Sequence, residues 1–487
     1  MPLHFASGIA HRESASFSGA AVMGLALLLL ACSGDPAPAT RPVDQDTGGS
    51  ETGAAVVQPV LLGELSIADA DYVAVGDYEG GSFGINVQPC RWDGQPQGLM
   101  ISEPYAEFGP IDSLVRGLGH FHSIAGSSTG FIPINAGATS GTGGWKCLPN
   151  GILAVSASID PSKPNIWGLL APTPGDYPAN FSSDVSSQVN FTMGTDKNVG
   201  NGRHLGSLGR FSDSSALQIP NAFGTGGSVG SDIRPAFAVF DILPGAFDFD
   251  DRVARFVYPE FHILLPPHVP AADYDANGFD DLCAIDITDD DVRIFYGPVA
   301  GDYDRTEADA VIRKDPHAEL EGFTYCGSIG DIDGDGDDDF AIGASDITAN
   351  GWTGGERTWW GGIAVFLDPP QGELLASDAD LVFRIEEDIL TMTHLFHPVG
   401  DLNGDGYDDV AYGGWGWNQV FIFYGPIHER GEIDHTHADA TITADATFNT
   451  ITATDFNNDG VSDLVLSNYL YEDRGAVWVF YGGSQPR

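Results

Sequence analysis

Residues 331–343, DIDGDGDDDFAIG, decide the fold, and three other segments of the chain repeat their pattern. The related segments are DYDANGFDDLCAI from Asp273, DLNGDGYDDVAYG from Asp401 and DFNNDGVSDLVLS from Asp455. All four fit Asp-x-[Asp/Asn]-x-[Asp/Asn]-Gly-x-x-Asp, a nine-residue acidic loop, followed by an apolar strand. Their starts lie 58, 70 and 54 residues apart. The chain therefore repeats a supersecondary unit of roughly 60 residues.

A second strand follows each loop at a similar distance. Three units end it with Phe-Tyr-Gly, in VRIFYG, VFIFYG and VWVFYG, and the fourth has IAVFLD at the same place. The repeated unit resembles the FG-GAP repeat of integrin alpha-subunit propellers and of many bacterial surface proteins. The four well-preserved copies cover about residues 260–487. The 63 glycines and 30 prolines also favour an all-β chain with many turns.

Weaker copies are expected in the first half, in YVAVGD from Tyr72, FIPIN from Phe131 and LQIPN from Leu217. Together with the later repeats they predict an all-β, seven-bladed β-propeller of four-stranded antiparallel blades over residues 52–487. Blades 1–3 are degenerate in this alignment and blades 4–7 carry the acidic loops. The first apolar residues after the seven loops are Tyr72, Phe131, Leu217, Leu282, Phe340, Val410 and Leu464.

The last repeat stops after VWVFYG and lacks the outer strand that residues 438–445 provide in the repeat before it. We expect the N-terminal segment 52–60, TGAAVVQPV, to join the last blade as this strand and tie the chain ends together. The alternative is a last blade of three strands.

The spacing of the acidic loops favours a hard cation. Oxygens at loop positions 1, 3, 5 and 9, with a backbone carbonyl at position 7, can converge on one ion. Carboxylate and amide oxygens without His or Cys select Ca²⁺ over zinc or copper. Position 12 is not Glu, so the loops are not EF-hands. Solvated acidic turns are the alternative.

The FG-GAP resemblance implies up to four structural Ca²⁺ ions and assigns their ligands by position. The side-chain ligands would be Asp273, Asp275, Asn277 and Asp281; Asp331, Asp333, Asp335 and Asp339; Asp401, Asn403, Asp405 and Asp409; and Asp455, Asn457, Asp459 and Asp463. The backbone carbonyls of Phe279, Asp337, Tyr407 and Val461 would complete the four shells.

The N-terminus has the pattern of an export signal. A weak basic region is followed by a short apolar run that ends in Leu29-Leu30-Ala31-Cys32, which resembles a bacterial lipobox. The resemblance implies a lipoprotein signal peptide over residues 1–31 and a lipid on Cys32. Residues 32–51 are expected to be a flexible tether. The expected location is the bacterial cell envelope, on the outer membrane or cell surface. Ordinary secretion with a coincidental cysteine is the alternative.

Four further cysteines permit two disulfides with three possible connectivities. Proximity in sequence favours Cys90–Cys147 and Cys283–Cys326.

The sequence shows no Gly-x-Ser-x-Gly elbow, the strand-to-helix turn that presents a catalytic serine, no His-Glu-x-x-His and no phosphate-binding glycine loop. His120 with His122, and His435 with His437, alternate as they would on one face of a strand, so either pair is a candidate for a transition metal. Polar strand or turn positions are the alternative. We therefore expect a binding protein rather than an enzyme, although a site assembled from distant blades is not excluded by motifs.

Aromatic residues gather between the second and third strands of the last three blades. They are Trp352, Trp359, Trp360, Trp415, Trp417, Tyr469 and Tyr471. The resemblance to integrin propellers places these connections on the ligand-binding face, opposite the acidic loops. Exposed rings suit stacking on sugars or anchoring a protein partner. The alternative is that they pack between blades.

Charge restricts the class of partner. With Lys+Arg 21 against Asp+Glu 69, the net charge is −48, which excludes a conventional nucleic-acid binder or a basic membrane-binding surface. The acidic loops hold 17 of the 69 acidic residues. The sequence thus predicts a lipid-anchored, calcium-binding propeller for surface adhesion or protein recognition. A carbohydrate-binding, lectin-like module and a hydrolase acting on polysaccharide or lipid are the alternatives.

Overall fold

The computed structural model shows an all-β chain whose short helices are single 3₁₀ turns. All described residues belong to the second of two compact units, Thr40–Arg487. No helix among them is long and apolar enough to cross a membrane. The described residues are 60–91, 97–108, 115–130, 145–148, 151–155, 167–170, 189–191, 199–205, 208–225, 236–241, 245–247, 251–258, 263–264, 271–286, 289–315, 323–344, 362–384, 395–413 and 418–483.

The repeating unit is an antiparallel meander of four strands with a fifth strand added in parallel at its outer edge. One such sheet has the order β21 (Phe323–Gly330), β22 (Asp339–Ala344), β23 (Gly362–Phe366), β25 (Leu381–Arg384) and β29 (Gly431–Asp434). The expectation of purely antiparallel, four-stranded blades is therefore wrong in this detail. The fifth strand comes from the following repeat, whose connecting segment runs along the edge before its own outer strand begins.

Two more sheets of the second half have the same five-stranded order. They are β16 (Ile263–Leu264), β17 (Leu282–Asp286), β18 (Asp291–Phe295), β20 (Ala310–Arg313) and β24 (Gly372–Leu375); and β26 (Leu395–Gly400), β27 (Asp409–Gly413), β28 (Gln419–Phe423), β30 (Ala440–Thr443) and β1 (Gly63–Ser66). The strands expected from Leu282, Phe340 and Val410 are confirmed as the second strands of their sheets.

The first half is also built of sheets, although its sequence repeats are weak. Their strands are β3 (Val87–Arg91), β4 (Gln97–Phe108), β5 (Val115–Ser123) and β6 (Gly126–Gly130); β7 (Trp145–Leu148), β8 (Gly151–Val155) and β9 (Trp167–Leu170); β10 (Val189–Phe191) with β14 (Gly245–Phe247); and β11 (Val199–Leu205), β12 (Gln218–Thr225), β13 (Ala236–Asp241), β15 (Ala254–Val257) and β19 (Gly301–Asp304). The strand expected from Leu217 is β12, second in its sheet. Phe131 lies outside the described residues.

Hydrophobic contacts between successive sheets form the core. All five residues are buried in β17, β18, β23 and β27, because both faces of these sheets are covered. One cluster joins Ile285 of β17 to Phe340 of β22, and another joins Val365 of β23 to Phe423 of β28. The first strands of consecutive sheets also adjoin one another, β21 with β26 and β26 with β31 (Thr450–Thr454).

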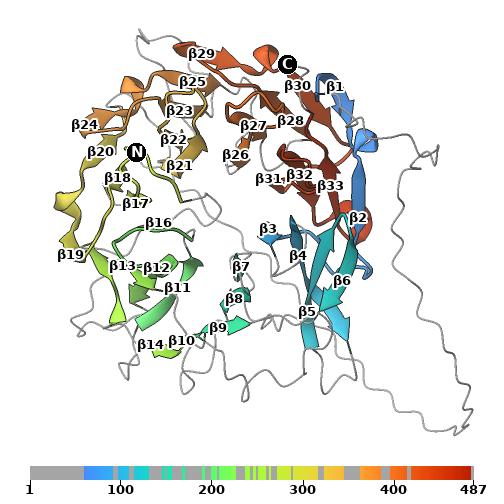
Figure 1. Cartoon of the computed structure of the whole chain (residues 1–487), viewed down its shortest axis with the longest axis horizontal. Helices are drawn as coiled ribbons and strands as arrows, with labels where there is room; N and C mark the ends of the chain where they lie inside the picture. The colour runs from blue at the N-terminus through green and yellow to red at the C-terminus, as the bar shows by residue number, and fades with distance from the viewer. Residues whose placement is uncertain are drawn as a thin grey trace, which may run out of the picture. The chain divides into compact units, whose positions relative to one another are not determined.

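The N-terminal segment completes the last sheet, but through a different strand from the one expected. The sheet order is β2 (Tyr72–Val75), β33 (Ala476–Phe480), β32 (Asp463–Asn468) and β31, with β2 antiparallel to β33 (Figure 1). The assignment of Tyr72 to the first repeat is therefore wrong. The closing position belongs to β2, and residues 52–59 of the expected strand lie outside the described residues.

A short repeat explains this correction. Residues 63–72, GELSIADADY, match GDYDRTEADA from Gly301, GELLASDADL from Gly372 and GEIDHTHADA from Gly431. Each copy forms a strand parallel to the preceding sheet, a 3₁₀ turn, and then the outer strand of its own sheet. The turns are η1 (Ile67–Asp69), η4 (Arg305–Glu307), η5 (Ala376–Asp378) and η6 (His435–His437). The closing strand was therefore readable from a pattern that lies outside the acidic loops.

A disulfide links two neighbouring sheets. Cys283 of β17 is bonded to Cys326 of β21, as proximity in sequence predicted. Cys90 is also disulfide-bonded. The side chain of Cys147, the partner expected for it, lies outside the described residues.

A substitution at Gly475 tests the attachment of the N-terminal segment to the last sheet. The Gly76 N–H donates to its carbonyl at 3.0 Å, and a Cβ on Gly475 would collide with the carbonyl oxygen of Phe83. Gly475→Ala should destabilise the protein by more than about 2 kcal/mol in urea unfolding, because backbone cannot yield as a side chain can. Gly372→Ala is the matched control: φ is +68° there, with nothing near a Cβ, so only about 1 kcal/mol should be lost. Equal losses would contradict this docking.

Candidate metal centre

The four acidic loops occupy the same place in four sheets, directly before the second strand. Residues 273–281 lead into β17, 331–339 into β22, 401–409 into β27 and 455–463 into β32. Glycine stands at position 6 of every loop with positive φ, +92° at Gly278, +105° at Gly336, +97° at Gly406 and +94° at Gly460. Residues with a side chain disfavour this conformation, which explains the glycine in the pattern.

Backbone N–H groups orient the carboxylate at position 1 of each loop. In the second loop, Oδ1 of Asp331 accepts from the N–H groups of Gly334 and Asp335, and Oδ2 accepts from Gly336 at 3.1 Å. Position 3 accepts the N–H of position 5, as Asp333 does from Asp335. The same bonds recur in the other loops, so the backbone of each loop holds its own candidate ligand side chain in place.

In the first, third and fourth loops, the aspartate at position 9 ties the loop to the segment that ends the third strand of its sheet. Asp281 accepts the N–H of Tyr274 at 2.7 Å and that of Gly297 at 2.7 Å. Asp409 and Asp463 make the equivalent pairs, with Leu402 and Gly425 and with Phe456 and Gly482. These glycines end the Phe-Tyr-Gly motif, so its third residue serves as a donor to the acidic loop.

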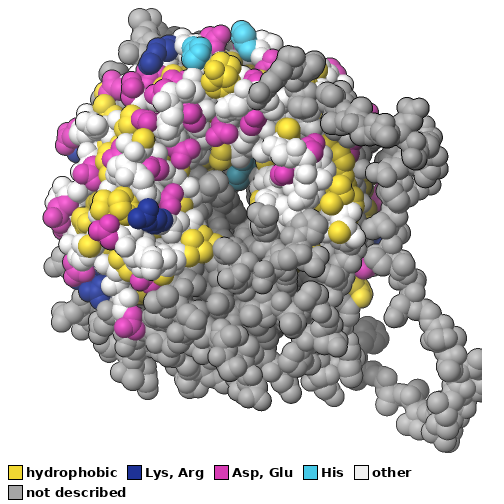
Figure 2. All heavy atoms as spheres, in the orientation of Figure 1, with side chains coloured by type: hydrophobic (Ala, Val, Ile, Leu, Met, Phe, Trp, Pro, Cys, Tyr) yellow, Lys and Arg dark blue, Asp and Glu magenta, His cyan; other side chains and the backbone are white. Residues whose placement is uncertain are grey.

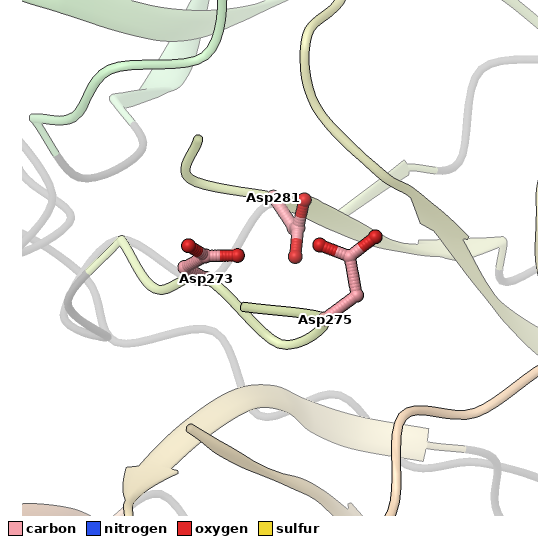
Figure 3. A group of neighbouring side chains, drawn as sticks. All are labelled: Asp273, Asp275 and Asp281. Atoms are coloured by element: carbon pink, nitrogen blue, oxygen red, sulfur yellow. The ribbon is translucent and has the colours of Figure 1, made fainter. Parts of the chain in front are cut away.

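Carboxylates converge in the first two loops. Oxygens of Asp273, Asp275 and Asp281 all lie within 4.8 Å of one another (Figure 3), and those of Asp331, Asp333 and Asp335 do the same. In the third and fourth loops an asparagine amide bridges to position 5 instead, from Asn403 to Asp405 and from Asn457 to Asp459, both at 2.9 Å. The part played by the carbonyls at position 7 stays a prediction.

Burial makes these carboxylates costly to ionise. Loss of water contact, and to a smaller extent the charges of neighbouring loop carboxylates, raise the pKa of Asp281, Asp339 and Asp409 to about 8 and that of Asp463 to about 7. A bound cation would remove this cost. The donors are carboxylate and amide oxygens, which fits a hard ion such as Ca²⁺ and not one that prefers sulfur or nitrogen.

Position 8 has a role that the sequence pattern did not reveal. The Oδ2 atoms of Asp338 and Asp408 accept the N–H groups of Asp273 and Asp331, each the first residue of the preceding loop. Burial is the main cause that raises the pKa of Asp338, to about 6. Each of these aspartates therefore links its loop to the loop of the sheet before it.

One degenerate loop satisfies its polar groups without an ion. Arg210 stands at position 1 and Gln218 at position 9 of the loop before β12. Oε1 of Gln218 accepts the N–H of Phe211 at 2.8 Å, and Nε2 donates to Ser212 at 2.6 Å. The guanidinium of Arg210 lies 4.6 Å from the ring centre of Phe279. A neutral amide thus replaces the carboxylate that the other loops bury.

The histidine pairs do not form a group of three metal-binding side chains among the described residues. His120 and His122 share a face of β5, as expected. Nε2 of His120 lies 3.0 Å from Glu103, and Nδ1 of His122 lies 2.7 Å from the hydroxyl of Tyr72. His435 and His437 lie in the 3₁₀ turn η6, not on a strand, because their segment is the turn of the short repeat.

Five of the seven aromatic residues of the expected ligand patch lie outside the described residues: Trp352, Trp359, Trp360, Trp415 and Trp417. Cys32 and the segments 1–31 and 32–51 also lie outside them. Of the two tyrosines, Tyr471 packs edge-on against the buried Trp478, with ring centres 5.0 Å apart. Tyr469 is half-buried, and Leu470 between them is 62% exposed.

Comparison with known proteins identifies one repeat. Residues 447–480, which contain β31, β32, β33 and the fourth acidic loop, match the family model of the FG-GAP repeat. A search among curated proteins finds no match for the chain. The match supports the resemblance drawn from the sequence for this unit of the chain.

The raised pKa values predict an unusual pH dependence for the metal-free protein. An unfolded aspartate has a pKa of about 3.9. A folded pKa near 8 therefore stabilises the fold below the unfolded value, and this contribution is lost as the pH rises through the folded value. The melting temperature without divalent cations should fall from about pH 5 to about pH 8.5. Asp409→Asn should flatten this slope, and a slope of opposite sign would contradict the burial cost.

Proposed function

We propose that this chain is a calcium-stabilised, seven-bladed β-propeller of FG-GAP type that acts as a protein-recognition or adhesion module on a bacterial cell surface. The FG-GAP repeat suggests a β-propeller protein-recognition module. The observation that carries the proposal further is the equivalence of the four acidic loops, which lie at one position of four successive sheets.

The count of seven blades is supported by the sheets of both halves. Among the described residues, seven strands stand second in sheets of at least three strands, and they are β4, β8, β12, β17, β22, β27 and β32. The first strands of neighbouring sheets adjoin in a series, including β31 with β3 and β3 with β7. The strand β2 joins the last sheet from the N-terminal side, which is how the ends of a propeller are commonly held.

Calcium would have a structural role in this proposal. Each loop connects the first and second strands, and in the first, third and fourth loops the last aspartate also holds the end of the third strand. An ion bound to positions 1, 3, 5 and 9 would neutralise buried carboxylates and fix three strands of a blade at once. Because such an ion binds the folded chain and not the unfolded one, it stabilises the fold by mass action.

The surface charge favours neutral or cationic partners. Figure 2 shows Asp and Glu side chains spread over the described part of one face, with few Lys or Arg among them. Partners with a negative surface would be repelled over this area. Recognition would fall to the connections between second and third strands, where Leu470 is exposed between two tyrosines.

A carbohydrate ligand is the second candidate, favoured by the tryptophans and tyrosines in these connections. The proposed location follows from the lipobox-like sequence at Cys32 and the apolar run before it. A lipid on Cys32 would hold the module at the membrane through the tether.

Removal of calcium tests the structural role. A chelator should lower the melting temperature of the full chain by several degrees, and added CaCl₂ should restore it, since four ions would stabilise the folded state only. Differential scanning calorimetry measures the effect. A melting curve that is identical with and without chelator would refute the calcium part of the proposal.

Partner capture tests the recognition role. Leu470→Asp should reduce the capture of a cell-surface protein or of a glycan on an array by about tenfold, because a charge replaces an exposed apolar anchor. Leu62→Asp is the matched control, with its side chain 59% exposed on a different connection. Both variants should melt as the wild type does. Equal capture by both variants would exclude this connection as the binding surface.

A further inference from the structure

One of the four position-9 aspartates has an oxygen without a hydrogen-bond donor. In the first, third and fourth loops both oxygens of this residue accept a backbone N–H. Asp339 accepts the N–H of Ile332 at 2.8 Å through Oδ2 only. Its Oδ1 is buried and has no partner, in a residue that is 1% exposed. A buried carboxylate oxygen without a donor is costly, so it points to a missing ligand.

A different residue just after the third strand of the same sheet, β23, accounts for the missing donor. Asp368 stands where the other sheets have Gly297, Gly425 and Gly482. These glycines are buried against the acidic loop, and a Cβ on Gly297 would lie 2.6 Å from Cβ of Phe279. Asp368 has a Cβ and is exposed, and no N–H of this segment donates to Oδ1 of Asp339. The N–H that would satisfy Oδ1 of Asp339 is therefore absent.

The second loop is also the richest in carboxylates. All four of its side-chain ligand positions are aspartates, whereas each other loop has three aspartates and one asparagine. Those at positions 1, 3 and 5 converge within 4.8 Å. Asp339 ends the same loop and lies outside this group of three. The free oxygen and the convergent group thus belong to one loop.

We propose that the loop 331–339 is the tightest of the four cation sites and fills first, with Oδ1 of Asp339 as a ligand atom that no other loop leaves free. The inference rests on the proposed calcium binding and specifies its order. The number of charged oxygen ligands and the rigidity of their scaffold set the affinity of a calcium loop. Here both the charge and the number of free oxygens are greatest, and backbone bonds to Asp331 hold the scaffold.

Isothermal titration of the full-length, metal-free chain with CaCl₂ tests the order. Asp339→Asn should remove the tightest class of sites, with its dissociation constant rising about tenfold or more. Asp409→Asn, the same change at the same position of the third loop, should leave that class in place and weaken a looser one. Asp368→Gly should weaken the tightest class, because the restored N–H competes for Oδ1 of Asp339.

Melting of the same variants without metal provides a second readout. Asp339→Asn should melt no lower than the wild type, since the amide oxygen keeps the bond to Ile332 and no carboxyl group is left to ionise in the buried site. Asp409→Asn should melt several degrees lower, because its amide faces the N–H of Gly425. A lower melting point for Asp339→Asn than for Asp409→Asn would overturn the assignment of a free oxygen.

The outcomes separate this inference from the proposed function. If the wild type binds no Ca²⁺ in the titration, calcium binding itself is refuted and the order of filling falls with it. If the wild type binds Ca²⁺ and the tightest class persists in Asp339→Asn, only the order is overturned. Loss of that class in Asp339→Asn and its retention in Asp409→Asn support the inference.

Discussion

The buried aspartate that ends each acidic loop is the constraint on which the repeat depends. Its two oxygens hold the second residue of the loop and, in three of the four sheets, the glycine that ends the third strand. A charged group in this position fixes strand order and register within a sheet, because every donor around it comes from a defined place in the chain. The same burial makes its charge expensive, which links the stability of the sheets to whatever neutralises the loops.

The residue before this buried aspartate, at position 8 of the loop, couples neighbouring sheets. Asp338 and Asp408 reach the first residue of the preceding loop, so the acidic loops form a connected series rather than separate sites. In the last loop Ser462 replaces the aspartate, and the degenerate loop at Arg210 begins the series with a cation of its own. Neutralisation of one loop would therefore alter the electrostatic surroundings of the next. Such a coupling is local, since it passes through one hydrogen bond between neighbouring sheets.

The sequence predicted what depends on a strict local pattern and missed what depends on partners distant in the chain. The second strands that follow the acidic loops and the loop glycines are predicted by spacing alone, and so is the pairing of Cys283 with Cys326. The strand β2 was misplaced because apolar alternation in YVAV fits any strand. Only the short repeat that begins at Gly63 identifies it as an outer strand. The role of position 8 could not be read, because its partner lies in another repeat. Asp368 could be seen to break Phe-Tyr-Gly, but its consequence for Asp339 requires the packed sheet.

The net charge separates two uses of acidic residues in this chain. Four Ca²⁺ would return only eight positive charges to a chain of net charge −48. A net charge of ~−40 would remain that ions in the loops do not neutralise. Part of this excess is paired on the outer strands, as Asp302 is with Arg252 and Arg255, but 21 basic residues cannot balance the rest. Aspartates of the first two loops therefore converge on one another, whereas many acidic residues elsewhere either pair with arginine, as the buried Asp286 and Asp291 do, or lie on the surface. A module of this kind would stay apart from anionic surfaces while its apolar and aromatic connections remain available to a neutral or cationic partner.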